Sequence, residues 1–251
     1  MVPRGLSPAG LVLVDKPAGP SSFAVVRDLR DRTGARAGHA GTLDPFATGL
    51  LIVLLGRATK LAGRFVGLDK RYLTEVDLTA VSSTGDPEGE LDPREPPGRA
   101  ELEAALAGLR GEIELPVPAY SAVKIGGERA YRLARKGVAV EMPLRRSFVY
   151  ALDVISCTGE EAVSAARLDV HVSSGTYVRA LAQALGGHCT SLRRTWVGPF
   201  SVDEAADVTA VELTPPSEAL ARLPAEAVDR VPAAVRAGVL ALEHPAGDGA
   251  A

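Results

Sequence analysis

Hydrophobic and polar positions follow short, regular patterns along this 251-residue chain, and each pattern predicts one element. Residues 10–14 and 50–55 are continuous aliphatic runs, which are typical of buried strands. From residue 70 to residue 80, apolar or small side chains occupy every second position, which predicts a strand with one buried face. Further strands are expected over 148–155, 168–173 and 196–202.

Apolar residues spaced three and four positions apart predict helices from Ser21 or Ser22 to about Arg32, over 101–109 and over 176–185. The apolar side of the first helix is expected to contain Phe23, Val26 and Leu29. A short basic helix is expected over 128–136, and a surface excursion over 82–98. Strands and helices do not alternate strictly. This favours a mixed or largely antiparallel sheet with helices packed on it.

The length of the chain suits one large domain with at most a small appendage. After residue 203 the sequence is rich in Ala, Pro and Glu and weakly patterned. We therefore expect a main domain over 1–213 and a short extension over 214–251, disordered from about Pro245. No apolar run approaches the ~20 residues of a membrane helix, and no signal-peptide core is visible. The expected location is the cytoplasm, away from membranes.

Charge is distributed unevenly along a chain whose net charge is −3. Segments 27–72 and 120–150 each carry an excess of five positive charges, whereas 80–115 and 201–251 each carry an excess of six negative charges. Basic blocks within an acidic total can form a positive face for nucleic acid. They can equally be solvated helix faces.

The most informative segment is 38–51, in which three glycines, a His, an Asp and a Pro stand directly before an apolar run. Glycines allow close approach of another backbone or a ligand, and the following proline pushes Asp44 toward extended backbone. Such a loop can present Asp44 as a nucleophile or as an acid–base group. An Asp before Pro is also common in plain turns, where it bonds its own backbone.

Other candidate residues have equally ordinary alternatives. His39 could be a base, a partner for a nucleobase or a metal ligand, although no second ligand stands at a useful spacing. Tyr72 follows two cations and could stack on a base, or it could be a half-buried strand residue. Arg179 lies near a helix start, where the dipole disfavours it, so a carboxylate partner is expected. Arg193 and Arg194 could bind phosphate or be solvated.

Six blocks in sequence order resemble the TruB family of tRNA pseudouridine synthases, and its bacterial branch in particular. These blocks are 11–22, 38–51, 70–72, 117–131, 172–181 and 192–200. The resemblance implies the pseudouridine synthase fold, which is a mixed α/β (α+β) fold with a large central, mainly antiparallel sheet flanked by helices. It also implies isomerisation of uridine to pseudouridine at position 55, in the T-loop of tRNA. The uridine is flipped from its stack, its N1–C1′ bond breaks, and C5 bonds to the same ribose carbon.

The resemblance also implies a role for each site residue. Asp44 would attack C1′ or remove the 2′ proton, Tyr72 would stack on the uracil and serve in proton removal from C5, and Arg179 would pair with Asp44 and keep it ionised. Substrate-binding or supporting positions are implied at His39, Lys16, Thr42, Tyr177 and Leu192. No metal or cofactor is implied. The partner would be the T-arm of tRNA, and we expect a monomer with no obligate protein partner.

Two departures from the family pattern stand out. The end of the first block and the residue after it read Pro20, Ser21, Ser22 and Phe23, where the family usually has an aromatic residue, Thr, Ser and then His. The tail after about Thr214 is short and acidic where members commonly carry an RNA-binding domain, so this extension is abbreviated and RNA affinity would rest on the two basic blocks.

Three alternative functions remain at this stage. A non-catalytic tRNA-binding or tRNA-folding protein would not need Asp44, Tyr72 and Arg179 as a set. A sibling synthase could act on another RNA. A glycosidase-like enzyme would need a second carboxylate acting with Asp44, and no motif nominates one.

Overall fold

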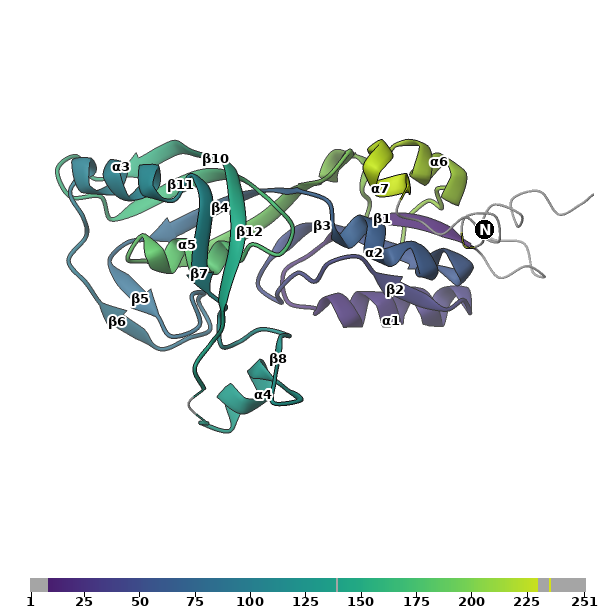
Figure 1. Cartoon of the computed structure of the whole chain (residues 1–251), viewed down its shortest axis with the longest axis horizontal. Helices are drawn as coiled ribbons and strands as arrows, with labels where there is room; N and C mark the ends of the chain where they lie inside the picture. Colours follow the sequence, from purple (N-terminus) through teal and green to yellow (C-terminus); the bar gives the residue numbers. More distant parts are fainter. Residues whose placement is uncertain (1–8, 139, 230–234, 236–251) are drawn as a thin grey trace, which may run out of the picture. The chain divides into compact units, whose positions relative to one another are not determined.

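The computed structural model describes residues 9–138, 140–229 and 235, and these residues form two compact units. Unit 1 comprises the described parts of 1–70 and 193–251, and unit 2 comprises those of 71–192. The chain passes between the units after the first residue of strand β4 (Lys70–Asp77) and within strand β12 (His188–Val197) (Figure 1).

Unit 1 is organised around strand β3. Its other strands are β1 (Gly10–Lys16), β2 (Ala37–His39), the end of β12 and β13 (Phe200–Ser201), with β3 spanning Thr48–Leu55. Its helices are α1 (Ser22–Thr33), α2 (Ala62–Val66), α6 (Pro216–Ala221) and α7 (Ala225–Asp229), with 3-10 turns η1 (Gly56–Leu61) and η2 (Val202–Glu204). Strand β3 pairs antiparallel with β1 and β2 and parallel with β12. The buried strand predicted over residues 50–55 is therefore confirmed as part of β3.

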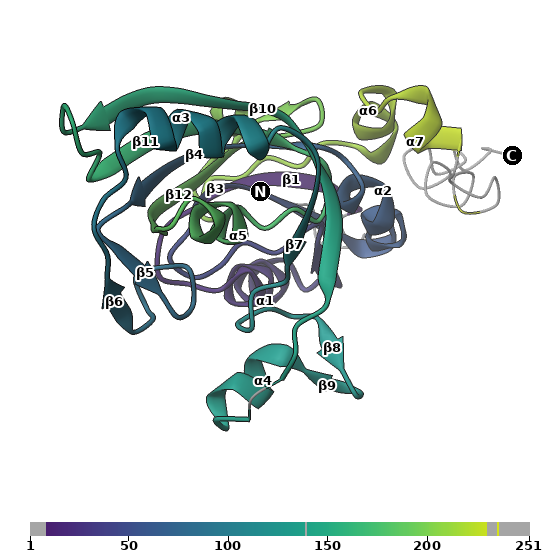
Figure 2. The ribbon, with the colours of Figure 1, turned by 60° about the vertical axis from the view of Figure 1, so that its left-hand side comes forward.

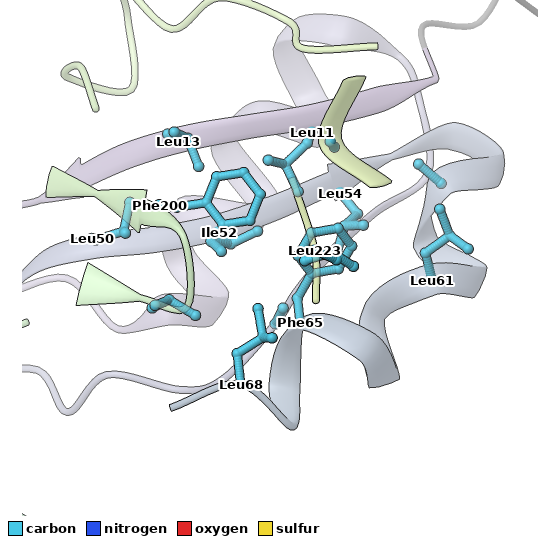
Figure 3. Close-up of a cluster of buried hydrophobic side chains, with 14 of the residues drawn as sticks. Leu11, Leu13, Leu50, Ile52, Leu54, Leu61, Phe65, Leu68, Phe200 and Leu223 are labelled. Carbon is cyan, nitrogen blue, oxygen red and sulfur yellow. The ribbon is translucent and has the colours of Figure 1, made fainter. Parts of the chain in front are cut away.

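The core of unit 1 packs around the aliphatic residues of β3 (Figure 3). Leu50 and Ile52 are completely buried, and the rings of Phe65 and Phe200 lie 5.8 Å apart. After β13, the chain adds Ala219, Leu220 and Leu223 to the same cluster. The beginning of the predicted extension thus packs on unit 1, whereas 230–234 and 236–251, including the expected disorder from Pro245, lie outside the described residues.

Helix α1 begins where the sequence predicts. The Ser21 side chain accepts a hydrogen bond from the amide of Ala24 at 3.2 Å, and the helix ends at Gly34 with φ 66°, as is common for caps of both kinds. Its buried residues are Ser22, Val25, Val26 and Leu29. Phe23 was wrongly placed on this face: it is 65 % exposed, because the buried face turns toward Ser22, whose hydroxyl bonds to a loop.

Unit 2 is built on antiparallel strands. Its strands besides β4 and β12 are β5 (Ala80–Ser82), β6 (Leu91–Pro93), β7 (Gly111–Pro116), β8 (Lys124–Ile125), β9 (Glu128–Arg129), β10 (Leu144–Thr158) and β11 (Ala165–Val172). Its helices are α3 (Arg99–Gly108), α4 (Ala130–Arg135) and α5 (Val178–Ala184). The main strands lie in the order β12, β4, β11, β10 and β7, and β10 is antiparallel to both β11 and β7.

The alternation predicted for residues 70–80 is present in β4, where Tyr72, Thr74 and Val76 are buried and Arg71 and Glu75 are exposed, but the strand ends at Asp77. The predicted mixed α/β fold with a mainly antiparallel sheet flanked by helices is confirmed, and the pairing of β3 with β12 is a parallel exception. Within the described ranges, no helix is long and apolar enough to cross a membrane.

The segment 82–98 is not simply a surface excursion. Ser82, Thr84 and Asp86 are buried there. The Ser82 hydroxyl donates to the main-chain carbonyl of Asp86 at 2.6 Å, and the Thr84 hydroxyl donates to the Asp86 carboxylate at 2.5 Å. The polar composition of the segment suggested an exposed loop, but polar residues can be buried when they are hydrogen-bonded to one another.

Two further elements differ from expectation because of tight turns. The basic helix begins at Ala130, since the preceding residues form the hairpin of β8 and β9. The strand expected over 196–202 is divided into β12 and β13, because Gly198 turns the chain with φ 52°.

Gly49 is required where β3 meets β12. Its φ is +99°, and a Cβ there would lie 2.3 Å from the carbonyl oxygen of Arg194. We expect Gly49→Ala to lower the free energy of unfolding by about 3 kcal/mol, through backbone strain and the displacement of β12. Urea unfolding measures this. Gly34→Ala is the control, because its φ is also positive but nothing lies within 4 Å of the added carbon; an equal loss in both variants would contradict the prediction.

Candidate functional site

The loop between β2 and β3 carries Asp44 in unit 1. The loop begins at Ala40, whose amide donates to the carbonyl of Ile52 at 2.9 Å. Within the loop, the amide of Ala47 donates to the carbonyl of Asp44 at 3.2 Å. Asp44 is half-buried and Thr42 is exposed. The loop therefore has a defined shape and presents its carboxylate-bearing residue at the edge of the core of unit 1.

Ser22 fixes the residue before Asp44. Its hydroxyl donates to the carbonyl of Leu43 at 2.9 Å and accepts from the amide of Leu43 at 2.8 Å. Both groups are buried, so these bonds satisfy polar atoms that water does not reach. The first residue of α1 thus holds the loop at the position where the carboxylate follows.

Lys16 holds the residue after Asp44. Its ammonium donates to the main-chain carbonyls of Pro17, Pro20 and Pro45, at 2.7, 2.9 and 3.2 Å. These bonds occupy all three donors of an ammonium. Burial lowers the pKa of Lys16 to about 8, and the charge of Asp44 opposes this shift. Lys16 is therefore close enough to Asp44 to interact with its charge, but its bonds are those of a support for the loop.

Arg194 lies beneath the loop. It is 1 % exposed. Its guanidinium donates to the carbonyls of Leu50, Gly41 and Thr42, at 2.7, 3.2 and 3.4 Å. Arg193 forms an ion pair with Asp15, with a shortest distance of 2.7 Å. The expectation of a solvated or phosphate-binding Arg194 was wrong, because both alternatives require an accessible guanidinium.

His39 is half-buried at the end of β2. Burial, and then the charge of Arg194, lowers the pKa of its imidazole, so the ring is neutral at pH 7. Its Nδ1 is buried and has no hydrogen-bond partner among the described residues. In the part of the chain that the structure describes, no group of three or more His, Cys, Asp or Glu residues is arranged to hold a metal ion.

In unit 2, Arg179 is the second residue of α5 and is 3 % exposed. Its guanidinium lies 3.1 Å from the carboxylate of Asp86 and donates to the carbonyls of Thr84 at 2.7 Å and Tyr120 at 2.9 Å. A glycine is needed at position 85, where a Cβ would lie 3.1 Å from the Cβ of Arg179. The start of α5 is thereby tied to the turn after β5.

Asp86 is a site residue that the sequence analysis missed. Its carboxylate also accepts a bond from the amide of Glu88 at 3.1 Å. Asp86 stands between a glycine and a proline in an acidic segment, and the Asp-Pro pair that drew attention to Asp44 would also have found it. Breaking a buried ion pair leaves an uncompensated charge, so Arg179 and Asp86 depend on each other for burial.

The remaining candidates of unit 2 have different surroundings. Tyr72 and Leu192 are buried on β4 and β12. Tyr177 is the half-buried N-cap residue of α5 and lines a small recess with Gly175 and Thr176. The structure thus groups Lys16, His39, Thr42 and Asp44 in unit 1 and Tyr72, Tyr177, Arg179 and Leu192 in unit 2.

The buried lysines of unit 1 make its stability depend on pH. Burial lowers the pKa of both Lys16 and Lys70 from 10.5 to about 8. Between these values the unfolded chain binds more protons than the folded one, so the free energy of unfolding should rise with pH from about 8 to about 10.5. Urea unfolding across this range should show a smaller rise for Lys16→Met. The exposed Lys60→Met is the control, and identical slopes in Lys16→Met and wild type would refute the prediction.

Comparisons with known proteins identify the family that this chain resembles. Residues 29–178 match the family model described as TruB family pseudouridylate synthase (N terminal domain). A protein of Bordetella avium (strain 197N) named tRNA pseudouridine synthase B is 42 % identical over 233 residues, which cover 88 % of this chain and 94 % of that protein. A protein of the same name from Corynebacterium jeikeium (strain K411) is 42 % identical over 225 residues, or 84 % of this chain and 73 % of that protein.

A solved structure is also similar to this chain. A chain in the crystal structure of a Cbf5-Nop10-Gar1 complex is 29 % identical, with a TM-score of 0.58 over 78 % of this chain and 50 % of that chain. This protein therefore spans about half the length of that chain. The match to the family model and the identity to the two bacterial proteins confirm the resemblance seen in the sequence motifs, and the chain belongs to the TruB family of pseudouridylate synthases.

Proposed function

We propose that this protein isomerises uridine to pseudouridine at position 55, in the T-loop of tRNA. The observation that carries the proposal is the anchoring of the Asp44 loop: Ser22, Lys16 and Arg194 bond to its main-chain groups on both sides of the carboxylate. The 42 % identity to a protein named tRNA pseudouridine synthase B supports the same reaction. A fixed carboxylate is what a reaction at one ribose carbon requires.

The proposed reaction begins when the uridine leaves its stack. Asp44 attacks C1′, or it removes the 2′ proton to give a glycal-type intermediate, and in either route the N1–C1′ bond breaks. The uracil then turns, C5 bonds to C1′, and the proton on C5 is lost while N1 gains one, so the product is an isomer of the substrate. Tyr72 stacks on the uracil and serves in the removal of the C5 proton. No metal or cofactor takes part.

Arg179 is proposed to pair with Asp44 during this reaction. A guanidinium offers five donors, so its bonds to Asp86, Thr84 and Tyr120 are compatible with a second carboxylate. A neighbouring cation favours the ionised form of Asp44. Asp86 supports this role because its ion pair with Arg179 fixes the guanidinium at the start of α5.

The other residues are proposed to hold the substrate. The neutral imidazole of His39 suits contact with the flipped nucleotide better than with a phosphate. Thr42 is exposed on the loop, and Tyr177 and Leu192 contribute to the base pocket, whereas Lys16 supports the loop. We further propose that the protein acts in the cytoplasm as a monomer, with tRNA as its partner.

The basic segment around α4 is proposed to contact the tRNA backbone. The hairpin of β8 and β9 and helix α4 project from the rest of unit 2 (Figure 2). Exposed cations are gathered there at Lys124, Arg129, Arg132, Arg135 and Lys136. Phosphate contacts dominate the affinity of most nucleic-acid binders, so this segment offers the charge that the acidic tail lacks.

Asp44→Asn should abolish the reaction and leave tRNA binding intact, because the amide cannot act as a nucleophile or a base. The measurement is tritium release from tRNA that carries [5-³H]uridine, with the modified position mapped afterward. Asp31→Asn on the exposed face of α1 is the control. Turnover by Asp44→Asn at the wild-type rate would remove Asp44 from the mechanism. Tight binding by wild type without release would favour a non-catalytic tRNA-binding protein, and modification only of another RNA would favour a sibling synthase.

The double variant Arg132→Gln/Arg135→Gln should weaken tRNA binding. It should also reduce the slope of log K against log salt by about 2, because each arginine is expected to neutralise one phosphate of the tRNA. Filter binding at several salt concentrations measures both quantities. Arg94→Gln/Arg99→Gln removes the same charge from exposed arginines in the acidic segment and should leave the slope unchanged. Equal slopes in all three proteins would refute a role for α4.

A further inference from the structure

Arg194 is a deeply buried cation whose described partners are main-chain carbonyls rather than carboxylates. Two of these carbonyls, from Gly41 and Thr42, belong to the first half of the Asp44 loop, and the third, from Leu50, belongs to β3 just beyond the loop. One guanidinium therefore bonds to the chain on both sides of Asp44. An apolar side chain of similar size could fill the space but could not form these bonds.

The main chain of Arg194 is itself held in place. Arg194 pairs with Gly49 in the parallel contact of β12 with β3, at a separation that leaves no room for a side chain at position 49. Its side chain thus starts from a fixed point and extends under the loop. A rigid strand and a planar group with several donors together define where the carbonyls of residues 41 and 42 lie.

Two buried lysines near Arg194 make its burial unfavourable. The charge of Arg194 contributes to lowering the pKa values of Lys16 on β1 and Lys70 at the start of β4, and also that of the neutral His39 on β2. The carboxylate of Asp44 opposes the shift at Lys16. Burying a guanidinium beside two ammonium groups costs stability, which indicates that its bonds have a role that an apolar residue would not fulfil.

We propose that Arg194 is a positioning residue of the isomerisation: its guanidinium fixes both ends of the loop and thereby sets where the carboxylate of Asp44 lies. This inference rests on the proposed function. Arg194 does not touch the substrate. It acts through the main chain of residues 41, 42 and 50, and a shift of the carboxylate by about 1 Å can lower a rate by about 100-fold.

The test compares three variants with wild type at a temperature at which circular dichroism shows all four proteins to be folded. Arg194→Met removes the bonds, and Arg194→Lys keeps the charge without the fork of donors. Arg222→Met is the matched control, because it removes an ion pair to Glu204 at 2.8 Å and a guanidinium 4.2 Å from the ring centroid of Phe200, elsewhere in unit 1. Tritium release gives kcat and KM for tRNA, and thermal unfolding gives the stability of each variant.

We expect Arg194→Met to lower kcat by about 100-fold with KM within about twofold of wild type, because the loop is displaced while RNA contacts remain. Arg194→Lys should melt closer to wild type and still lose at least about tenfold in kcat. Arg222→Met should melt lower with kcat within about twofold of wild type. A wild-type kcat in Arg194→Lys, or an equal loss of kcat in Arg222→Met, would overturn the inference.

Amide hydrogen exchange tests the inference without activity. The amides of Leu43 and Ala47 are bonded within the loop arrangement, so they should exchange faster in both Arg194 variants and remain protected in Arg222→Met. Unchanged exchange in Arg194→Met would refute the positioning role. If wild type released no tritium at all, the proposed function would fail, whereas the exchange result would still decide whether Arg194 holds the loop.

Discussion

The main constraint on unit 1 is that the polar main-chain groups of an irregular loop must be bonded where the loop lies against a dry core. Strand β3 is almost entirely buried, so the residues that precede it cannot rely on water for their carbonyls and amides. A regular ladder is also not available to a turn with this shape. Side-chain donors from three separate elements take its place: Lys16 from β1, Ser22 from α1 and Arg194 from β12.

In unit 2 an ion pair contributes to holding an irregular buried segment. The turn after β5 places the carbonyl of Thr84 and the carboxylate of Asp86 against the guanidinium of Arg179. Here the buried cation has a carboxylate partner, which compensates part of its desolvation. In both units a guanidinium thus fixes a segment that contains an Asp-Pro pair, and the two arrangements differ in whether the Asp itself is the described partner of that guanidinium.

Local patterns in the sequence predicted the parts of the structure that local physics determines. The aliphatic run of β3 and the alternation of β4 appear as expected because the period of a strand fixes which side chains face the core. The buried polar partners could not be found in this way, since the bonds of Arg194 to Gly41 and of Arg179 to Thr84 join residues 153 and 95 positions apart. Phe23 was misplaced for a related reason. The hydroxyl of Ser22 bonds to Leu43 and turns the buried face of α1 toward it, and the spacing of apolar residues gives no sign of such a bond. The sequence therefore nominated Asp44 and Arg179, and the family resemblance implied Lys16 as a supporting position. It did not identify Ser22, Arg194 or Asp86 as residues that hold them.

This difference bears on how the proposed reaction can work without a cofactor. The substrate and product are isomers, so the enzyme must keep the detached uracil and the ribose carbon together until C5 has replaced N1. Water that reached the ribose carbon in this interval would leave an abasic site. A carboxylate on a mobile loop would lengthen the time for which uracil and ribose are separated. A carboxylate whose neighbouring residues are bonded to β1, α1 and β12 stays beside the ribose carbon throughout the reaction. The unfavourable burial of Lys16 and Arg194 is then a stability cost of holding one carboxylate still, which explains why these two cations lie beneath the loop rather than on the surface.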